Sequence, residues 1–244
     1  MVYKAVCAHT ICRVAVKIVM RSEECAREAA VLKQLTVGSA DTALWSAYPR
    51  FLGSVGQALI MELCDTDLAT RARDLAVTEE VIDVVNRGIR RALSHMHAAH
   101  LVHLDVKLRN LLWVDLSRRA VLTDFSLTEP VDALVPVRLQ NTVGYRPPEL
   151  LRHDDDSETR PARLATDWWA FGVVLWELAH VANCKRARHM FPEGSGAGGS
   201  RALVEQYVRH DEASLLRRIG RWGPVVGDLC HKDPSPRFYL ARGT

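Results

Sequence analysis

Residues 103–110 read His-Leu-Asp-Val-Lys-Leu-Arg-Asn, and residues 124–126, which begin 14 positions after Asn110, read Asp-Phe-Ser. The stretch between them holds two short runs of branched residues around a polar turn, which predicts a β-hairpin with these motifs on the loops at its ends. The motifs contribute two carboxylates, a carboxamide and an ammonium group: Asp105, Asp124, Asn110 and Lys107. Such groups can hold a hard cation and accept a proton. We therefore expect the chemistry of the protein to lie at this hairpin.

A second candidate group lies upstream of the hairpin. Residues 14–17 read Val-Ala-Val-Lys and predict a strand that carries a lysine, and Glu28 stands on the helix that follows. A strand lysine held by a helix carboxylate is preorganised to bind phosphate oxygens. Lys17 taken alone is more often a solvated surface residue, so the functional interpretation depends on Glu28 and on the downstream motifs.

The pattern of β-branched and amphipathic segments divides the chain into two parts. Up to Cys64 it predicts one helix that begins at Ser22 and four strands, at about 2–6, 12–19, 50–54 and 58–63. Beyond Cys64, helices dominate, including one from Thr78 to about His100 and a strongly apolar one over about 166–181. This predicts a small β-rich lobe and a larger α-rich lobe, with a ligand-binding cleft near residue 64.

Composition sets the broad class of protein. Of 244 residues, 48% are hydrophobic and 25% charged, and the net charge is +3, which fits a folded globular chain and is too weak to indicate nucleic-acid binding. The longest apolar run, 168–176, is about half the length of a membrane-spanning helix, and no secretory signal is visible. Six scattered cysteines without a CxxC pair favour a reduced intracellular chain and argue against a structural zinc site.

Six short motifs stand in order along the chain: Val-Ala-Val-Lys at 14–17, the two motifs at 103–110 and 124–126, Thr-Val-Gly-Tyr-Arg-Pro-Pro-Glu at 142–149, Asp-Trp-Trp-Ala-Phe-Gly at 167–172 and Asp-Pro-Ser-Pro-Arg at 233–237. In this order and spacing they resemble the eukaryotic protein kinases over essentially the whole length. Leu104 takes the place of the family's arginine in HRDxxxxN, and Ser126 that of the glycine in DFG. One such motif would be weak evidence, whereas six in order are strong.

The resemblance implies an α+β, bilobal protein-kinase-like fold. We expect a β-rich N-lobe over 1–64 and a larger α-helical C-lobe over 65–244. The glycine-rich loop of the family is missing before Tyr3, so the first strand is truncated, and only seven residues follow Arg237, so the final helix is expected to be incomplete. Either the sequence is a fragment of a longer protein or the protein never had the loop. Without the loop's backbone donors to phosphate we expect weakened activity of this chain, and we expect a full-length form to be active.

The resemblance also implies a role for each catalytic position. Asp105 would orient the acceptor hydroxyl and take its proton, and Lys107 would offset charge on the transferred phosphoryl group. Asn110 and Asp124 would hold Mg²⁺. Lys107, together with Thr142, favours serine or threonine acceptors in proteins over tyrosine.

The nucleotide-binding positions follow in the same way. Lys17, paired with Glu28, would fix the α- and β-phosphates of ATP. Met61 stands in the gatekeeper place, and Glu62 to Cys64 would form the hinge whose backbone binds adenine. The resemblance therefore implies a serine/threonine protein kinase that uses ATP and Mg²⁺, acts on protein substrates, and associates directly with neither nucleic acid nor membrane.

One stretch narrows the resemblance to a subfamily. Residues 124–130 read Asp-Phe-Ser-Leu-Thr-Glu-Pro and, together with the His-Leu-Asp form at 103–105, are similar to the herpesviral protein kinases. This implies a viral enzyme of the virion tegument and host nucleus that acts on viral and nuclear host proteins. Leu104 removes the arginine that grips a phosphorylated activation loop, so we expect little dependence on such phosphorylation.

Two other functions remain open. A pseudokinase or weak fragment that serves as a binding module would keep the fold with little turnover. A small-molecule phosphotransferase would share the HxDxxxxN core, but the motifs at 142–149 and 233–237 resemble the part of protein kinases that docks peptides.

Several features favour a plain structural interpretation. Four histidines suit helix-end and core positions better than a metal site: His95, His97, His100 and His103. The acidic run 154–156 reads as a solvated loop, and the basic residues of 185–188 read as a charged surface, although they could bind acidic partners or act as a nuclear signal. The GxGxxG match at 194–199 follows a proline rather than a strand, which favours a linker.

Overall fold

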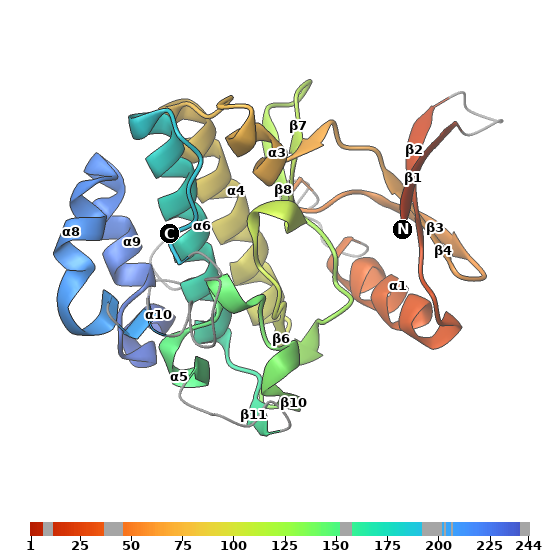
Figure 1. Cartoon of the computed structure of the whole chain (residues 1–244). Helices are drawn as coiled ribbons and strands as arrows, with labels where there is room; N and C mark the ends of the chain where they lie inside the picture. The colour runs from red at the N-terminus through yellow and green to blue at the C-terminus, as the bar shows by residue number, and fades with distance from the viewer. Residues whose placement is uncertain are drawn as a thin grey trace.

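A computed structural model describes residues 1–6, 12–36, 46–151, 158–191, 202, 204, 205 and 207–239. In Figure 1 a sheet with one helix lies on one side of the molecule, and a larger helical part lies on the other. The arrangement is the mixed α+β, bilobal one that the sequence predicts. The turn after β1, the acidic run 154–156 and the glycine-rich stretch 194–199 lie outside the described residues.

The N-terminal part is an antiparallel sheet with strand order β1-β2-β4-β3. Its elements are β1 (Val2–Val6), β2 (Arg13–Ile18), α1 (Ser22–Thr36), β3 (Phe51–Val55) and β4 (Ala58–Glu62). Gly56 has φ +56° in the turn between β3 and β4, a conformation that suits glycine. Helix α1 contacts β3 and β4 and buries Leu32 and Leu35. The sheet thereby holds β2, which carries Lys17, beside α1, which carries Glu28.

Two long helices form the centre of the C-terminal part. Helix α4 (Glu79–Ala98) begins where Thr78 caps it, its hydroxyl accepting from the Val81 N–H at 3.3 Å. Helix α6 (Leu164–Cys184) is buried on nearly every side, and the side chains of Trp168, Trp169 and Trp176 are all 1% exposed or less. A helix that is apolar all round belongs in a core, as the sequence predicts.

Short strands hold the loops between these helices. Strands β5 (Thr66–Asp67), β7 (Leu111–Val114) and β8 (Arg119–Leu122) form one sheet, β6 (Leu101–Val102) pairs with β9 (Glu129–Pro130), and β10 (Leu134–Pro136) pairs with β11 (Thr159–Pro161). The 103–110 loop thus runs from β6 to the β7–β8 hairpin, and the 124–126 motif lies between β8 and β9. Because β6 and β9 pair, the entrance of one loop is tied to the exit of the other.

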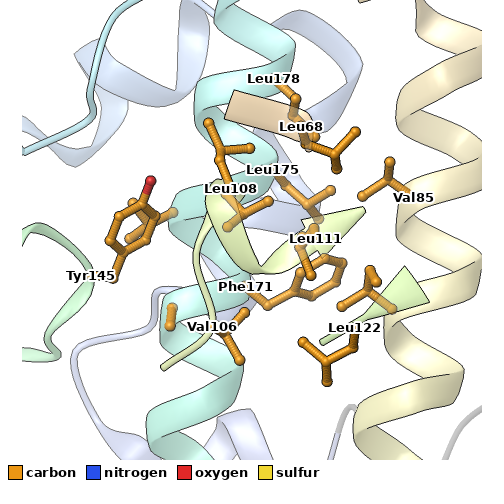
Figure 2. Close-up of a cluster of buried hydrophobic side chains, with 14 of the residues drawn as sticks. Leu68, Val85, Val106, Leu108, Leu111, Leu122, Tyr145, Phe171, Leu175 and Leu178 are labelled. Carbon is orange, nitrogen blue, oxygen red and sulfur yellow. The ribbon is translucent and has the colours of Figure 1, made fainter. Parts of the chain in front are cut away.

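The 103–110 loop rests on the apolar core. Figure 2 shows Val106 and Leu108 among buried side chains from α6, which include Phe171 and Leu175. The residues that alternate with them, Asp105 and Lys107, carry polar side chains that contact one another instead. The loop is therefore anchored by every second residue, and its polar side chains form a separate cluster.

Shorter elements complete the chain: α3 (Leu68–Arg73), η1 (Leu108–Asn110), η2 (Val137–Leu139), η3 (Val143–Tyr145), α5 (Pro148–Leu151), η4 (Tyr207–Asp211), α8 (Glu212–Arg217), η5 (Gly220–Trp222), α9 (Gly223–Leu229) and α10 (Pro234–Tyr239). Helices α9 and α10 pack on α6. Gly172 of α6 lies so close to Cys230 that an added Cβ would stand 2.6 Å from its sulfur, which explains a glycine within this helix. No helix within the described residues is long and apolar enough to span a bilayer.

Candidate active site

A buried carboxylate of α6 sets the backbone of the 103–110 loop. Asp167 is fully buried, and its two oxygens accept hydrogen bonds from the backbone N–H groups of His103 at 2.8 Å and Leu104 at 2.9 Å. The ring Nε2 of His97 lies 2.9 Å from the same carboxylate. These contacts hold Leu104 at φ +63°, an uncommon conformation for a branched residue. The loop is thus fixed before any ligand binds.

Asp105 lies at the centre of a dense polar cluster. Asn110 Nδ2 donates to the backbone carbonyl of Asp105 at 2.8 Å and to its Oδ2 at 2.9 Å. Lys107 Nζ lies 2.7 Å from the same oxygen, and the Thr142 hydroxyl donates to Oδ1 at 2.9 Å. Because a carboxylate offers about four acceptor positions, Oδ1 retains room for one more hydrogen bond.

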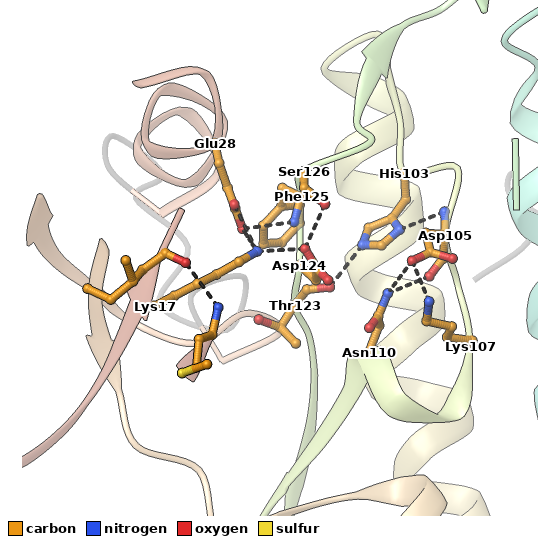
Figure 3. Close-up of polar contacts among 12 residues, drawn as sticks. Lys17, Glu28, His103, Asp105, Lys107, Asn110, Thr123, Asp124, Phe125 and Ser126 are labelled. Atoms are coloured by element: carbon orange, nitrogen blue, oxygen red, sulfur yellow. Dashed lines mark hydrogen bonds and ion pairs between the residues drawn. The ribbon is translucent and has the colours of Figure 1, made fainter. Parts of the chain in front are cut away.

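Lys17 forms the second cluster, shown with the first in Figure 3. Its ammonium group lies 2.7 and 2.8 Å from the two carboxylate oxygens of Glu28 and 2.6 Å from Asp124 Oδ1. Burial lowers the pKa of Lys17, but the two carboxylates outweigh it, and the pKa is raised overall. Burial raises the pKa of Asp124, but Lys17 and the Ser126 hydroxyl outweigh this, so that the pKa is lowered overall. Lys17 is therefore an ammonium and Asp124 a carboxylate at neutral pH.

Glu28 is the most buried member of the second cluster. Its side chain is 2% exposed, and its Oε1 also accepts from the backbone N–H of Phe125 at 3.3 Å. Burial raises the pKa of Glu28, and the attraction of Lys17 offsets this only in part. Keeping Glu28 ionised therefore costs free energy of desolvation, which points to a function for the Lys17–Glu28 ion pair other than stability.

His103 connects the two clusters. Its Nε2 lies 3.1 Å from the Thr123 carbonyl, and its Nδ1 accepts from the Asp105 N–H at 3.2 Å. A carbonyl can only accept and an N–H can only donate, so this geometry selects the neutral ring protonated at Nε2. Thr123 also donates its N–H to the Asn110 carbonyl at 3.0 Å. The structure thus brings Lys17, Asp105, Asn110 and Asp124 to one place, as the sequence leads us to expect.

Two oxygens, one from each cluster, are left for a divalent cation. Asn110 Nδ2 is fixed by Asp105, and within the described residues its Oδ1 has no hydrogen-bond partner. The Oδ1 of Asp124 is taken by Lys17 and Ser126, which leaves Oδ2. Carboxylate and amide oxygens are ligands that Mg²⁺ accepts, in company with water and phosphate oxygens.

The expected adenine-binding residues lie on β4 and just after it. Met61 is buried in the core, and Cys64 is buried beside Val114 and Val121. The Glu62 carboxylate forms an ion pair with Arg119, and its backbone N–H donates to the Arg50 carbonyl at 2.9 Å. Because the Glu62 N–H is already bonded, any hydrogen bond from residues 62–64 to adenine would come from their other backbone N–H and carbonyl groups.

The segment from 124 to 149 is fixed by contacts of its own. Leu104 packs with Val102, Val135 and Ala162, so an apolar cluster fills the place where the family has an arginine. Arg237, fully buried, donates to the two oxygens of Glu149 at 2.7 and 3.2 Å, which joins the motif at 233–237 to the motif at 142–149.

Some contacts of this segment were missed at the sequence level. Arg146 donates from its guanidinium to the backbone carbonyls of Arg138, Gln140 and Asn141. Arg27 of α1 forms an ion pair with Glu129 at 2.5 Å. The TxxYRxPE pattern marks Arg146 as notable but does not reveal its acceptors, and Arg27 carries no motif signal at all.

The candidate histidines serve separate contacts. His95 lies 3.2 Å from the Tyr48 hydroxyl, His97 faces Asp167, and His103 joins the two loops. Within the described residues, no group of three or more histidine, cysteine, aspartate or glutamate side chains is placed to hold a metal ion.

Comparisons with known proteins agree with this geometry. A family model described as "Protein kinase domain" matches residues 1–194. The chain is similar to human ribosomal protein S6 kinase alpha-4 (29% identical over 175 residues, 66% of this chain and 20% of that protein). It is also similar to serine/threonine-protein kinase mig-15 of Caenorhabditis elegans (32% over 128 residues, 50% and 11%) and to cAMP-dependent protein kinase catalytic subunit 2 of Drosophila melanogaster (36% over 87 residues, 36% and 22%). The aligned part thus spans between 11% and 22% of these relatives' lengths.

Proposed function

The chain belongs to the protein kinase domain family, and on that premise we propose that it transfers the γ-phosphoryl group of ATP to serine or threonine hydroxyls of proteins. The observation that carries the proposal is the convergence of Lys17, Asp105, Asn110 and Asp124 from β2 and from two loops. Serine/threonine kinases among the relatives support the choice of acceptor.

Asp105 is the group that receives the acceptor proton. Its Oδ2 is held by Asn110 and Lys107, so the carboxylate cannot rotate freely, and its Oδ1 faces Thr142. A hydroxyl placed at Oδ1 would be aligned for attack on the γ-phosphorus of ATP. It would lose its proton to the carboxylate as the new O–P bond forms and the bond from the γ-phosphorus to the oxygen shared with the β-phosphate breaks, releasing ADP. Lys107 also lies where it can stabilise negative charge on the phosphoryl oxygens.

Lys17 holds the nucleotide. Within the described residues its ammonium group contacts two carboxylates, and phosphate oxygens would replace Asp124 as a partner while Glu28 keeps the amine in place. Mg²⁺, bound by Asn110 and Asp124, would neutralise phosphate charge. Once Lys17 leaves Asp124, both carboxylate oxygens can bind Mg²⁺, although Oδ1 still accepts the hydrogen bond from Ser126.

Contacts within the chain hold residues 124–149, the activation segment, without phosphorylation. Leu104 packs among apolar side chains, while Arg146 and the Arg27–Glu129 pair already hold the segment. We infer that the enzyme does not require a phosphorylated loop.

We further propose the herpesviral subfamily, with residence in the virion tegument and the host nucleus. The Asp-Phe-Ser-Leu-Thr-Glu-Pro run at 124–130 and the His-Leu-Asp form support it. Ser126 gives the run a local purpose, because its hydroxyl donates to Asp124 at 2.8 Å, a bond that glycine cannot make. Immunodetection of the chain in purified virions and infected nuclei tests this part.

Radiolabelled ATP, Mg²⁺ and a basic protein substrate test the main proposal. We expect Asp105→Asn to reduce transfer by about 10²–10⁴-fold, while Asp228→Asn, an exposed carboxylate on α9, leaves it unchanged. Equal background from the unmodified chain and Asp105→Asn would instead favour a binding module. Transfer to a free aminoglycoside or choline but not to protein would favour a small-molecule phosphotransferase.

A further inference from the structure

A cavity of about 660 Å³ opens beside the Asp105 cluster. It lies between α3, α6, the 103–110 loop and segments 142–145 and 187–191, and its size is typical of ligand-binding sites. Lys107 and Thr142 line it, and both also contact Asp105. A peptide whose hydroxyl reaches Asp105 can therefore extend into this cavity.

The lining of the cavity is strongly cationic. Four permanently charged side chains face it, Arg73, Lys107, Arg109 and Arg188, against the single carboxylate of Glu177. Within the described ranges neither Arg109 nor Arg188 forms an ion pair, and both residues are exposed. In the part of the chain that the structure describes, Arg73 contacts the Thr70 hydroxyl at 3.3 Å and forms an exposed pair with Asp74 at 3.8 Å, which is worth little.

The one carboxylate is already in use. Glu177 is 3% exposed at its side chain, and it accepts from the Tyr145 hydroxyl at 2.7 Å and faces His189 Nδ1 at 2.9 Å. Burial and the Glu177 charge raise the pKa of Tyr145 well above its usual value, so the phenol remains a donor. A basic peptide side chain would have to displace these partners and enter a field of arginines.

We propose that this cavity binds an anionic side chain, a carboxylate or a phosphorylated serine, of the protein substrate. The inference rests on the proposed kinase activity and names the substrate class for it. An extended peptide advances about 3.3 Å per residue, so the anion would lie within about three residues of the acceptor, given that Lys107 touches both places. Arginine recognises carboxylate and phosphate through paired N–H donors, and a cationic cleft also raises the association rate of such peptides.

Arg188 belongs to the basic stretch 185–188, and the structure separates its members. Arg188 lines the cavity, whereas Arg186 is exposed on the same segment and does not line it. The two arginines are therefore a matched pair for mutation, with the same charge and nearly the same sequence position.

Binding of short fluorescent peptides to the full chain tests the inference without requiring turnover. Each peptide carries alanine at the acceptor position, and glutamate, phosphoserine, glutamine or arginine at one position from about −3 to +3. We expect the best glutamate or phosphoserine peptide to bind about tenfold more tightly than its glutamine match, as a charge-assisted bond predicts. Arg188→Gln should reduce that preference to about twofold, and Arg109→Gln should do the same, while Arg186→Gln leaves it unchanged. A tighter phosphoserine peptide identifies a phosphate site, and equal affinities identify a general anion site.

Three results would overturn the inference. These are equal affinity for glutamate and glutamine peptides at every position, preference for arginine, or a charge preference that Arg188→Gln and Arg186→Gln change equally. Parallel transfer assays with serine acceptors keep the two proposals apart. Selective anion binding without transfer above the Asp105→Asn background contradicts the kinase activity alone, and transfer without charge preference contradicts the anion site alone.

Discussion

The Asp105 cluster and the Lys17 cluster lie side by side but are held by different parts of the molecule. Asp105 is fixed by Asn110 and Lys107, five and two residues away, on a loop anchored to α6. Lys17 meets Glu28 across 11 residues and Asp124 across 107, so three separate elements must be in place at once. The first cluster belongs to one rigid lobe, and the second depends on how β2 and α1 sit against the loop.

This difference predicts two different effects of mutation, on folding for one cluster and on nucleotide binding for the other. Damage to the support of Asp105 should unfold the C-terminal part, because the loop and the core share contacts. Damage to the Lys17 cluster should leave the fold intact and impair nucleotide binding, because burial already makes the Glu28 charge unfavourable there. The following variants compare the two clusters, from the largest expected effect to the smallest.

Asp167→Asn should give the largest effect, on both stability and activity. The amide cannot accept as the carboxylate does from two backbone N–H groups and His97, so at least one buried donor loses its partner. A loss of about 3 kcal/mol corresponds to a fall in Tm of about 6–12 °C for a chain of this size. Thermal unfolding measures it, with Asp228→Asn as the control. An unchanged Tm would show that the loop does not depend on α6.

Most of the fold could be predicted because its signals are local. Thr78 caps α4, and an uninterrupted apolar run marks α6, so both helices appear in the sequence at nearly their observed bounds. The strand pairs around Gly56 follow from branched residues and a turn. Pairings such as β6 with β9 had no such signal, since each has two residues, and only the tertiary structure brings them together.

Glu28→Gln should give the clearest contrast. The substitution removes a buried carboxylate whose pKa burial raises, so Tm should stay constant or rise slightly. Asp124 is then the remaining carboxylate partner of Lys17. We expect KM for ATP to rise about tenfold, which corresponds to a loss of about 1.4 kcal/mol in the free energy of ATP binding. Glu24→Gln, exposed on the same helix, is the matched control. A large loss of stability from Glu28→Gln would mean that the two clusters are equally structural.

The site could be predicted wherever motif and chemistry coincide. Lys17, Glu28, Asp105, Asn110 and Asp124 stand in recognisable patterns, and the structure brings them together. Side-chain contacts between residues that are far apart in the sequence and belong to no motif could not be predicted this way. Tyr145 and His189 lie on separate segments and both contact Glu177 of α6, and no spacing in the sequence links the three.

A smaller effect is expected where α1 meets the activation segment. Arg27 and Glu129 form a partly exposed ion pair, so Arg27→Gln should change Tm little and reduce transfer no more than about fivefold. A double-mutant cycle with Glu129→Gln should show a coupling of about 0.2–1 kcal/mol. Additive effects would show that the pair does not help to position α1, and Arg21→Gln, an exposed arginine just before the same helix, serves as a control.

The smallest effect is a dependence of stability on alkaline pH. The folded protein raises the pKa of Lys17 above its ordinary value of 10.5 because the carboxylates outweigh burial, so folding favours the protonated amine. The stabilisation from this proton is complete below pH 10.5 and is lost as the pH rises through the folded pKa. The Tm of the unmodified chain minus that of Lys17→Met should therefore stay constant from about pH 8 to 10 and shrink above that range. Taking the difference in Tm cancels the contributions of the tyrosines and other lysines, because these titrate in both proteins. A difference that grows with pH would mean that burial, rather than Glu28 and Asp124, dominates at Lys17, and the contrast between the two clusters would then fail at its central residue.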